Sequence, residues 1–162
     1  MVAKKILVCT DFSDNSRPAL ELAVEYAKAF GAQLLIFHAI DYFHAIDYTD
    51  FPSHVDWGEK LNEILENTKR SAKARLELMA REYAPLVKEV KTYCRNGMAS
   101  ELIVALAQQE SVDLIVVGTH GRTGVKHLVM GSVARSVLKT AHRPVLIVEG
   151  PAEKGESSEG PQ

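Results

Sequence analysis

Apolar side chains follow two alternating patterns along the chain, continuous runs and helically spaced positions. Short continuous runs are typical of strands that are buried on both faces of a sheet. Such runs occupy residues 4–10, 32–40, 112–118 and 143–150. Apolar residues spaced at i, i+3, i+4 and i+7, which predict amphipathic helices, occupy residues 17–30, 59–83, 99–109 and 132–141.

A fifth strand is predicted at residues 86–94, where apolar and polar side chains partly alternate. This alternation suits a strand near the edge of a sheet. Local signals mark the helix ends: Pro18 fits a first helical turn, Gly31 fits a C-terminal stop, and Pro85 ends the long second helix.

The resulting order β-α-β-α-β-α-β-α-β predicts an α/β fold with three layers, in which helices cover both faces of an open parallel five-stranded sheet. Each crossover is expected to be right-handed. The hydrophobic pattern does not define the order of the strands. Ligands of such sheets bind beyond the carboxyl ends of the strands, where the winding direction reverses. The candidate segments are therefore residues 10–13, 38–42 and 118–132.

The third of these segments, "GTHGRTGVKHLVMGS", joins a predicted strand to a predicted helix and is rich in glycine. Gly131 and Ser132 stand at the start of the helix, whose free N–H groups and partial positive charge favour an anion. The segment matches neither the P-loop pattern GxxxxGK[ST] nor the dinucleotide pattern GxGxxG. From the spacing alone, an alternative stays open in which the glycines only shape turns and Ser132 only caps the helix.

The spacing Gly118-x2-Gly121-x9-Gly131-Ser132 resembles the G-x2-G-x9-G-[ST] motif of the ATP-binding branch of the universal stress protein family. The segments "ILVCTDFSDNSRPAL" and "GSVARSVLKTAHRPVLIV" are also similar to that family, and the resemblance covers residues 2–149. It implies a Rossmann-like fold of the adenine nucleotide alpha hydrolase-like type, with strand order 3-2-1-4-5. It also implies ATP at the reversal between the first and fourth strands.

The resemblance also assigns site residues, position by position. Asp11 would contact the ribose or a Mg²⁺ ion, and Thr10 would lie beside it. The backbone of Ala39 would hold adenine, and Gly118 would lie against the ribose. The positions that would hold the phosphates are Gly121, Gly131, Ser132 and the backbone of Val133.

The role of Asp11, and that of one further candidate, Arg122, have simpler alternatives. Asp11 is also suited to a turn or cap, and Arg122, inside the glycine-rich loop, either neutralises phosphate charge or is only solvated. Ala134 stands where a hydroxyl side chain is often found in the family, so an additional hydroxyl contact is not available there.

Composition narrows the functional classes. The 162 residues are 46% hydrophobic and carry a formal net charge of −2, which gives no electrostatic case for nucleic acid or an anionic membrane. No apolar stretch has the length of a membrane span, and no signal peptide is apparent. Cys9 and Cys94 lack metal-ligand or CxxC spacing and are predicted to be small buried hydrophobes. We expect a cytoplasmic protein.

We predict one domain, residues 1–149, followed by a polar, disordered tail at residues 150–162. The aperiodic segment 41–58 starts on the ligand side of the sheet, and we predict that it is a mobile flap over the nucleotide. The apolar last strand, residues 144–148, would form a homodimer edge, as the family resemblance implies.

The favoured function is that of an ATP-binding, nucleotide-dependent stress-response or regulatory module that acts on a protein client. ATP hydrolysis would be slow at most, because no P-loop lysine and no positioned base and nucleophile are recognisable. The alternative is a dimeric interaction protein of the same fold without functional nucleotide binding. A nucleotide-cleaving enzyme of the ATP pyrophosphatase type is disfavoured, because "TDFSDNS" stands where its SGGxDS loop is expected.

Overall fold

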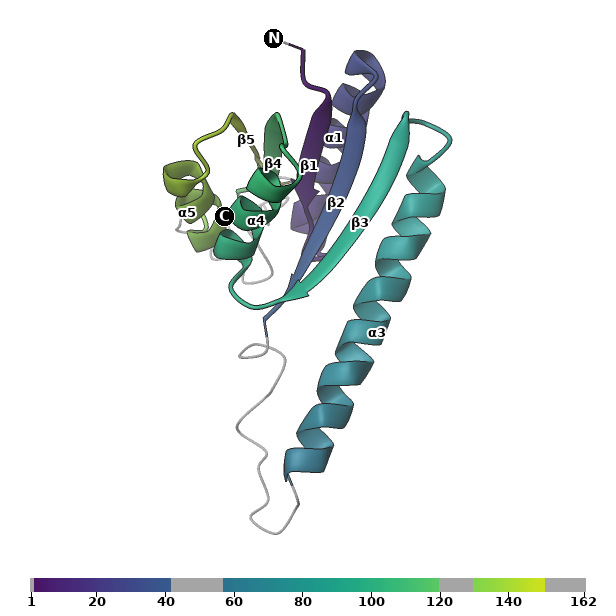
Figure 1. Cartoon of the computed structure of the whole chain (residues 1–162), viewed down its shortest axis with the longest axis vertical. Coiled ribbons are helices and arrows are strands. Elements are labelled where there is room, and N and C mark those ends of the chain that lie inside the picture. The colour runs from purple at the N-terminus through teal and green to yellow at the C-terminus, as the bar shows by residue number, and fades with distance from the viewer. Residues whose placement is uncertain (1, 42–56, 120–129, 151–162) are drawn as a thin grey trace, which may run out of the picture.

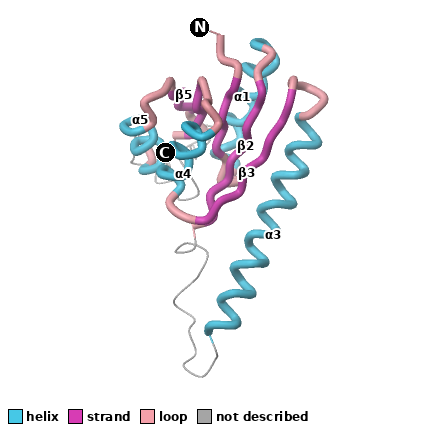
Figure 2. Tube along the Cα trace, viewed as in Figure 1, coloured by secondary structure: helices cyan, strands magenta, loops and turns pink. Residues whose placement is uncertain are grey.

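The computed structural model describes residues 2–41, 57–119 and 130–150 (Figure 1). Their elements alternate between strand and helix, as the sequence pattern predicts (Figure 2). The strands are β1 (Lys5–Cys9), β2 (Gln33–Ile40), β3 (Glu89–Asn96), β4 (Leu114–Gly118) and β5 (Val145–Val148). The helices are η1 (Asp14–Ser16, a 3-10 turn), α1 (Arg17–Phe30), α3 (Trp57–Tyr83), α4 (Ala99–Gln109) and α5 (Ser132–Thr140).

The five strands form one parallel sheet in the order β3-β2-β1-β4-β5, so both the predicted fold class and the predicted strand order are confirmed. The chain builds outward from β1 to β3 and then returns to place β4 on the other side of β1. The winding direction therefore reverses between β1 and β4, with Val8 paired to Val116. This is the position at which open parallel sheets bind ligands.

Two apolar cores cover the two faces of the sheet, because successive side chains of a strand point to opposite faces. Ile6 and Val8 of β1 pack with α1 and α3, whereas Leu7 packs with α4 and α5. Figure 1 shows α1 and α3 on one side of the sheet and α4 and α5 on the other. Since both faces are covered, the central strands are apolar throughout, which is the pattern that identified them in the sequence.

Helix α1 shows how local sequence sets the bounds of an element. Pro18 lies in its first turn, and the helix ends at Gly31, whose φ of 62° lies in the left-handed region. The Gly31 N–H donates to the carbonyl of Lys28 at 3.3 Å. The helix buries one face, formed by Ala19, Leu20, Ala23, Val24 and Ala27. Both predicted end signals are confirmed.

Helix α3 is 27 residues long, and its first turns extend past the carboxyl ends of the strands (Figure 1). It is fixed on the sheet by Ala72 and Leu76, which are buried. It ends at Tyr83, two residues before Pro85, as predicted.

Strand β3 begins three residues later than the alternating pattern predicts. The chain first makes a turn after α3, in which the Leu86 N–H donates to the carbonyl of Tyr83 at 2.9 Å. The predicted edge position of β3 is confirmed. Strand β4 also begins later than predicted. The Val112 N–H instead closes the end of α4, by donating to the carbonyl of Ala107 at 2.9 Å.

Replacing Gly31 tests the helix end. A methyl group at Gly31 would meet no atom within 4 Å, so the penalty for Gly31→Ala is the left-handed backbone alone. We expect the free energy of unfolding, measured in urea, to fall by about 1–2 kcal/mol. Gly31→Asn is the matched control and should lower it less, because asparagine tolerates this conformation. Equal losses in the two variants would contradict this explanation.

Candidate functional site

The candidate site lies where β1 and β4 end side by side. Thr10 follows β1, and its N–H donates to the carbonyl of Phe37 on β2 at 2.9 Å, so the sheet pairing continues into the loop. Gly118 is the last residue of β4, at the same level as Thr10 in the register that pairs Val8 with Val116. The sheet edge therefore brings together segments that are more than a hundred residues apart in the sequence.

The start of α5 is fixed directly to the end of β4. The Thr119 N–H donates to the carbonyl of Val148 at 2.8 Å, and the Gly131 N–H donates to the carbonyl of Thr119 at 2.7 Å. These bonds bring together Gly118 and Gly131, the first and last glycines of the predicted motif. Gly121 and Arg122, which were predicted to contact phosphate, lie outside the described residues.

The first turn of α5 presents backbone N–H groups at this edge. Gly131 is the N-cap residue, with φ −65° and ψ 160°, and Arg135 donates to its carbonyl at 3.1 Å. No side chain among the described residues caps the helix. The interpretation of Ser132 as the cap is therefore wrong: Ser132 is already the first helical residue. Ser132 and Val133 are exposed, and first-turn N–H groups have no partner within their own helix.

The carboxylate of Asp11 shapes the loop after β1. Its Oδ1 accepts hydrogen bonds from the N–H of Ser13 at 2.9 Å and from the Ser13 hydroxyl. This is the turn role that was the alternative to a ligand role. The two roles are compatible, because an ionised carboxylate has about four lone-pair sites.

Thr10 connects this loop to the start of α1. Its buried hydroxyl accepts from the N–H of Phe12 at 3.0 Å and lies 3.0 Å from the hydroxyl of Ser16. Since the Ser16 hydroxyl donates to the carbonyl of Ser13 at 2.9 Å, the Thr10 hydroxyl is the donor to Ser16. The loop is thus fixed by a chain of directed hydrogen bonds.

Ala39 lies near the end of β2, two residues after Phe37, whose carbonyl pairs with Thr10. It is partly buried and packs on the face covered by α4 and α5. The adjacent His38 is buried, and its Nδ1 lies 2.8 Å from the carbonyl of Thr10. Because a carbonyl only accepts, Nδ1 carries the hydrogen in this contact.

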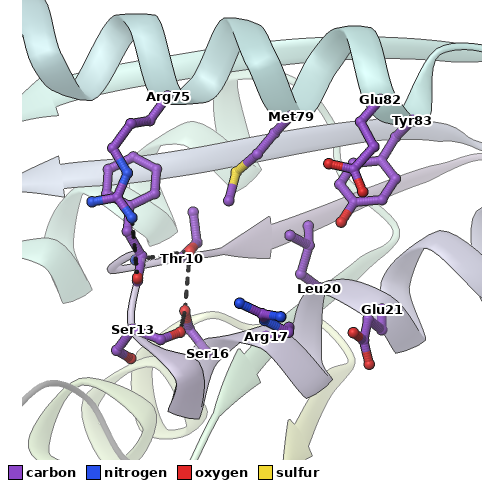
Figure 3. Close-up of a pocket in the computed structure, with 11 residues that line it drawn as sticks. Thr10, Ser13, Ser16, Arg17, Leu20, Glu21, Arg75, Met79, Glu82 and Tyr83 are labelled. Atoms are coloured by element: carbon purple, nitrogen blue, oxygen red, sulfur yellow. Dashed lines mark hydrogen bonds between the residues drawn. The ribbon is translucent and has the colours of Figure 1, made fainter.

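A groove of about 260 Å³ opens between α1 and α3 beside this loop (Figure 3). Thr10, Ser13 and Ser16 line its loop end. Its sides carry charges of both signs, from Arg17, Glu21, Arg75 and Glu82. At its far end, burial raises the pKa of Tyr83, and the charges of Glu82 and Glu21 add to this effect, so the phenol is neutral near pH 7.

Sequence reasoning did not identify Phe12 or Arg75 as part of the site. Phe12 lies within the predicted segment 10–13, but a phenylalanine in the sequence gives no indication that its backbone φ is positive. Arg75 is 63 residues away and contacts the loop only because α3 docks beside it. No spacing pattern could have found this contact.

Several other predictions concern chemistry away from the loop. Cys9 and Cys94 were predicted to be buried, but both are only partly buried at the margins of the two cores. Desolvation still raises the pKa of each thiol, so both remain neutral near pH 7. Within residues 2–41, 57–119 and 130–150, no group of three His, Cys, Asp or Glu side chains could hold a metal ion. In the same ranges no helix is long and apolar enough to cross a membrane. The predicted flap and tail lie almost entirely outside the described residues.

The parallel order β3-β2-β1-β4-β5, with helices on both faces, defines an α/β protein with three layers and a winding reversal between β1 and β4, the position at which proteins of this class bind ligands. The family described as the Universal stress protein family matches residues 3–149, and this chain belongs to it.

Relatives cover nearly the whole chain. Universal stress protein MJ0531 of Methanocaldococcus jannaschii is 34% identical over 151 residues, which span 93% of this chain and 85% of the relative. The solved structure of MJ0577, a universal stress protein of the same organism, is 30% identical with a TM-score of 0.81, and covers 94% of this chain and 99% of its own. A universal stress protein solved in complex with cAMP is 26% identical with a TM-score of 0.59, and covers 93% and 100%.

The Thr10 hydroxyl can be tested by an isosteric change. Thr10→Val leaves the partly buried N–H of Phe12 without its acceptor, and we expect the free energy of unfolding to fall by about 1–3 kcal/mol. Thr10→Ser keeps the hydroxyl and should lose about 1 kcal/mol or less, as expected for one methyl group. Chemical denaturation measures both, and a serine variant as unstable as the valine variant would contradict the hydrogen-bond role.

Proposed function

We propose that this protein binds ATP together with Mg²⁺ at the carboxyl edge of β1, β2 and β4, and acts in the cytoplasm as a nucleotide-dependent stress-response or regulatory module. The observation that carries the proposal is the first turn of α5. It begins at a glycine, no described side chain caps it, and hydrogen bonds hold it against the end of β4.

The phosphates interact with this helix start. Exposed first-turn N–H groups and the partial positive charge of a helix N-terminus are suited to a phosphate. Gly131 has no Cβ, so phosphate oxygens approach the backbone closely, and the Ser132 hydroxyl and the Val133 N–H add donors. Gly121 and Arg122, from the same motif, extend the phosphate contacts.

The nucleoside lies toward β1 and β2. Asp11 faces the same edge and binds the ribose or Mg²⁺, an ion that prefers oxygen ligands. Its Oδ1 already holds the Ser13 turn, so the carboxylate is presented in a fixed orientation. Gly118 lies against the ribose, Thr10 lies beside Asp11, and the backbone of Ala39 holds adenine. The universal stress protein solved with cAMP supports an adenine nucleotide as the ligand class.

The protein binds ATP but hydrolyses it only slowly. The motif has no P-loop lysine to neutralise charge on the transferred phosphoryl group. We therefore propose a switch or sensor that reports nucleotide to a protein client, in which hydrolysis is slow.

Replacing Gly131 tests nucleotide binding. Its φ and ψ are accessible to any residue, so a side chain there obstructs close approach without straining the backbone. We expect Gly131→Val to weaken ATP·Mg²⁺ binding, measured by calorimetry, by at least about tenfold, equivalent to about 1.4 kcal/mol. Gly131→Ala should have an intermediate effect, and thermal unfolding checks that both variants are folded.

Unchanged affinity in Gly131→Val would contradict the phosphate site. If the wild-type protein neither binds added ATP·Mg²⁺ nor releases an adenine nucleotide on denaturation, the proposal as a whole fails. The second candidate, an interaction protein without functional nucleotide binding, would then be favoured.

We also propose a homodimer through β5. This strand is an edge of the sheet, and its four apolar residues are only partly buried. The carbonyl of Pro144 accepts from the N–H of Ile115 on β4, and that of Val148 accepts from Thr119, which directly follows β4. Because parallel strands direct alternate residues to opposite sides, the N–H groups of Val145 and Ile147 point outward and can pair with a second copy.

Sedimentation at micromolar concentration should give a dimer mass for the wild-type protein. Ile147→Pro removes an outward N–H and should shift the protein to monomer. Ile147→Ala, the matched control, loses a similar part of the side chain but keeps the N–H, and should remain mainly dimeric. A monomeric wild-type protein would refute the interface.

A further inference from the structure

The loop that carries Asp11 contains an unusual backbone conformation. Phe12 has a φ of 64°, a left-handed value that bulky residues rarely adopt. The other two non-glycine residues with positive φ among those described, Ser111 and His142, follow the ends of α4 and α5. Left-handed residues are routine at such helix ends. Phe12 has no such explanation, so other contacts must stabilise it.

The Phe12 side chain and carbonyl are both contacted by Arg75 of α3. The Arg75 guanidinium carbon lies 4.1 Å from the centre of the Phe12 ring, and its Nη2 donates to the Phe12 carbonyl at 3.3 Å. In Figure 3, Arg75 extends from α3 toward the loop that carries Thr10 and Ser13. One side chain therefore contacts both the ring and the backbone of the strained residue.

A second ring supports Phe12 from the sheet. The ring centres of Phe12 and His38 are 4.2 Å apart, at an angle of 32°. His38 is buried on β2 and is itself bonded to the carbonyl of Thr10. Phe12 is thus held by a fixed group of the sheet and by the end of a long side chain from α3.

The shape of the guanidinium group makes arginine suited to this position. Its planar guanidinium can stack on an aromatic ring and donate hydrogen bonds at its edge at the same time, which the compact ammonium of lysine cannot do. Its reach is defined because α3 is docked by Ala72 and Leu76, which lie on either side of Arg75 in the sequence and are buried.

We propose that Arg75 is a positioning residue for nucleotide binding. By holding Phe12 in its left-handed conformation, Arg75 fixes the direction in which the neighbouring Asp11 carboxylate faces the β1–β4 edge. This proposal rests on the nucleotide site proposed above, and it adds a residue of α3 that lies outside the glycine-rich motif.

The first test needs no nucleotide. Arg75→Met keeps a long apolar stem but removes the guanidinium. In the free protein, we expect amide exchange of Phe12 and Ser13, followed by NMR, to accelerate by about three- to tenfold, because an exposed cation–π contact and one hydrogen bond are lost. Arg70→Met, an equal charge change on the same helix, should leave both rates unchanged. Equal rates in wild type and Arg75→Met would overturn the proposal.

The second test is ATP·Mg²⁺ affinity, measured by calorimetry. Arg75→Met should raise Kd by about three- to tenfold with little change in melting temperature, and Arg75→Lys should have a smaller effect. In a Phe12→Leu background, Arg75→Met should raise Kd less than it does in the wild-type background, since the ring contact is absent and only the hydrogen bond to the backbone carbonyl of residue 12 remains to be lost. An unchanged Kd in Arg75→Met, or the same rise with Arg70→Met, would overturn the positioning role.

The two tests separate this inference from the proposed function. If the wild-type protein binds no ATP but Arg75→Met still accelerates exchange at Phe12, the nucleotide function fails while the contact that holds the loop stands. If ATP binds and neither exchange nor Kd responds to Arg75→Met, the nucleotide function stands and the positioning role fails.

Discussion

The parallel pairing of β1 with β4 is the interaction on which the candidate site depends. It forces the chain to change its winding direction, so that the loops after β1 and β4 leave the same edge of the sheet in divergent directions. This pairing is what places the Asp11 loop and the start of α5 at the same edge of the sheet. Two apolar cores, one on each face of the sheet, stabilise this pairing. The side chains of the central strands pack into both cores, which is why these strands are apolar and buried.

The two halves of the site are built by different physical means. Among the described residues, the α5 half is fixed mainly by backbone: a glycine N-cap, an exposed first helical turn, and hydrogen bonds that connect the helix start to Thr119. The β1 half uses side chains, because the Thr10 hydroxyl and the Asp11 carboxylate fold the loop around themselves. A backbone site suits phosphates of any nucleotide, whereas the side-chain half supplies orientation.

Long-range contacts complete the β1 half. Phe12 adopts a conformation that its own sequence neighbours do not favour, and His38 and Arg75 stabilise it from two other elements. The site therefore depends on the docking of α3, which shares no motif residue with it.

The sequence by itself determined the elements, the layers and the segments that meet at the carboxyl edge of the sheet, because these follow from the local hydrophobic period and from the end signals at Pro18, Gly31 and Pro85. The strand order came from the family resemblance, since periodicity does not record which strands pair. Only the tertiary structure decided that Gly131 caps α5 in place of Ser132, that Oδ1 of Asp11 accepts a hydrogen bond from Ser13 in its own turn, and that Arg75 contacts Phe12. Those outcomes depend on how backbone ends and long side chains meet after the helices dock, and no local pattern encodes such distances.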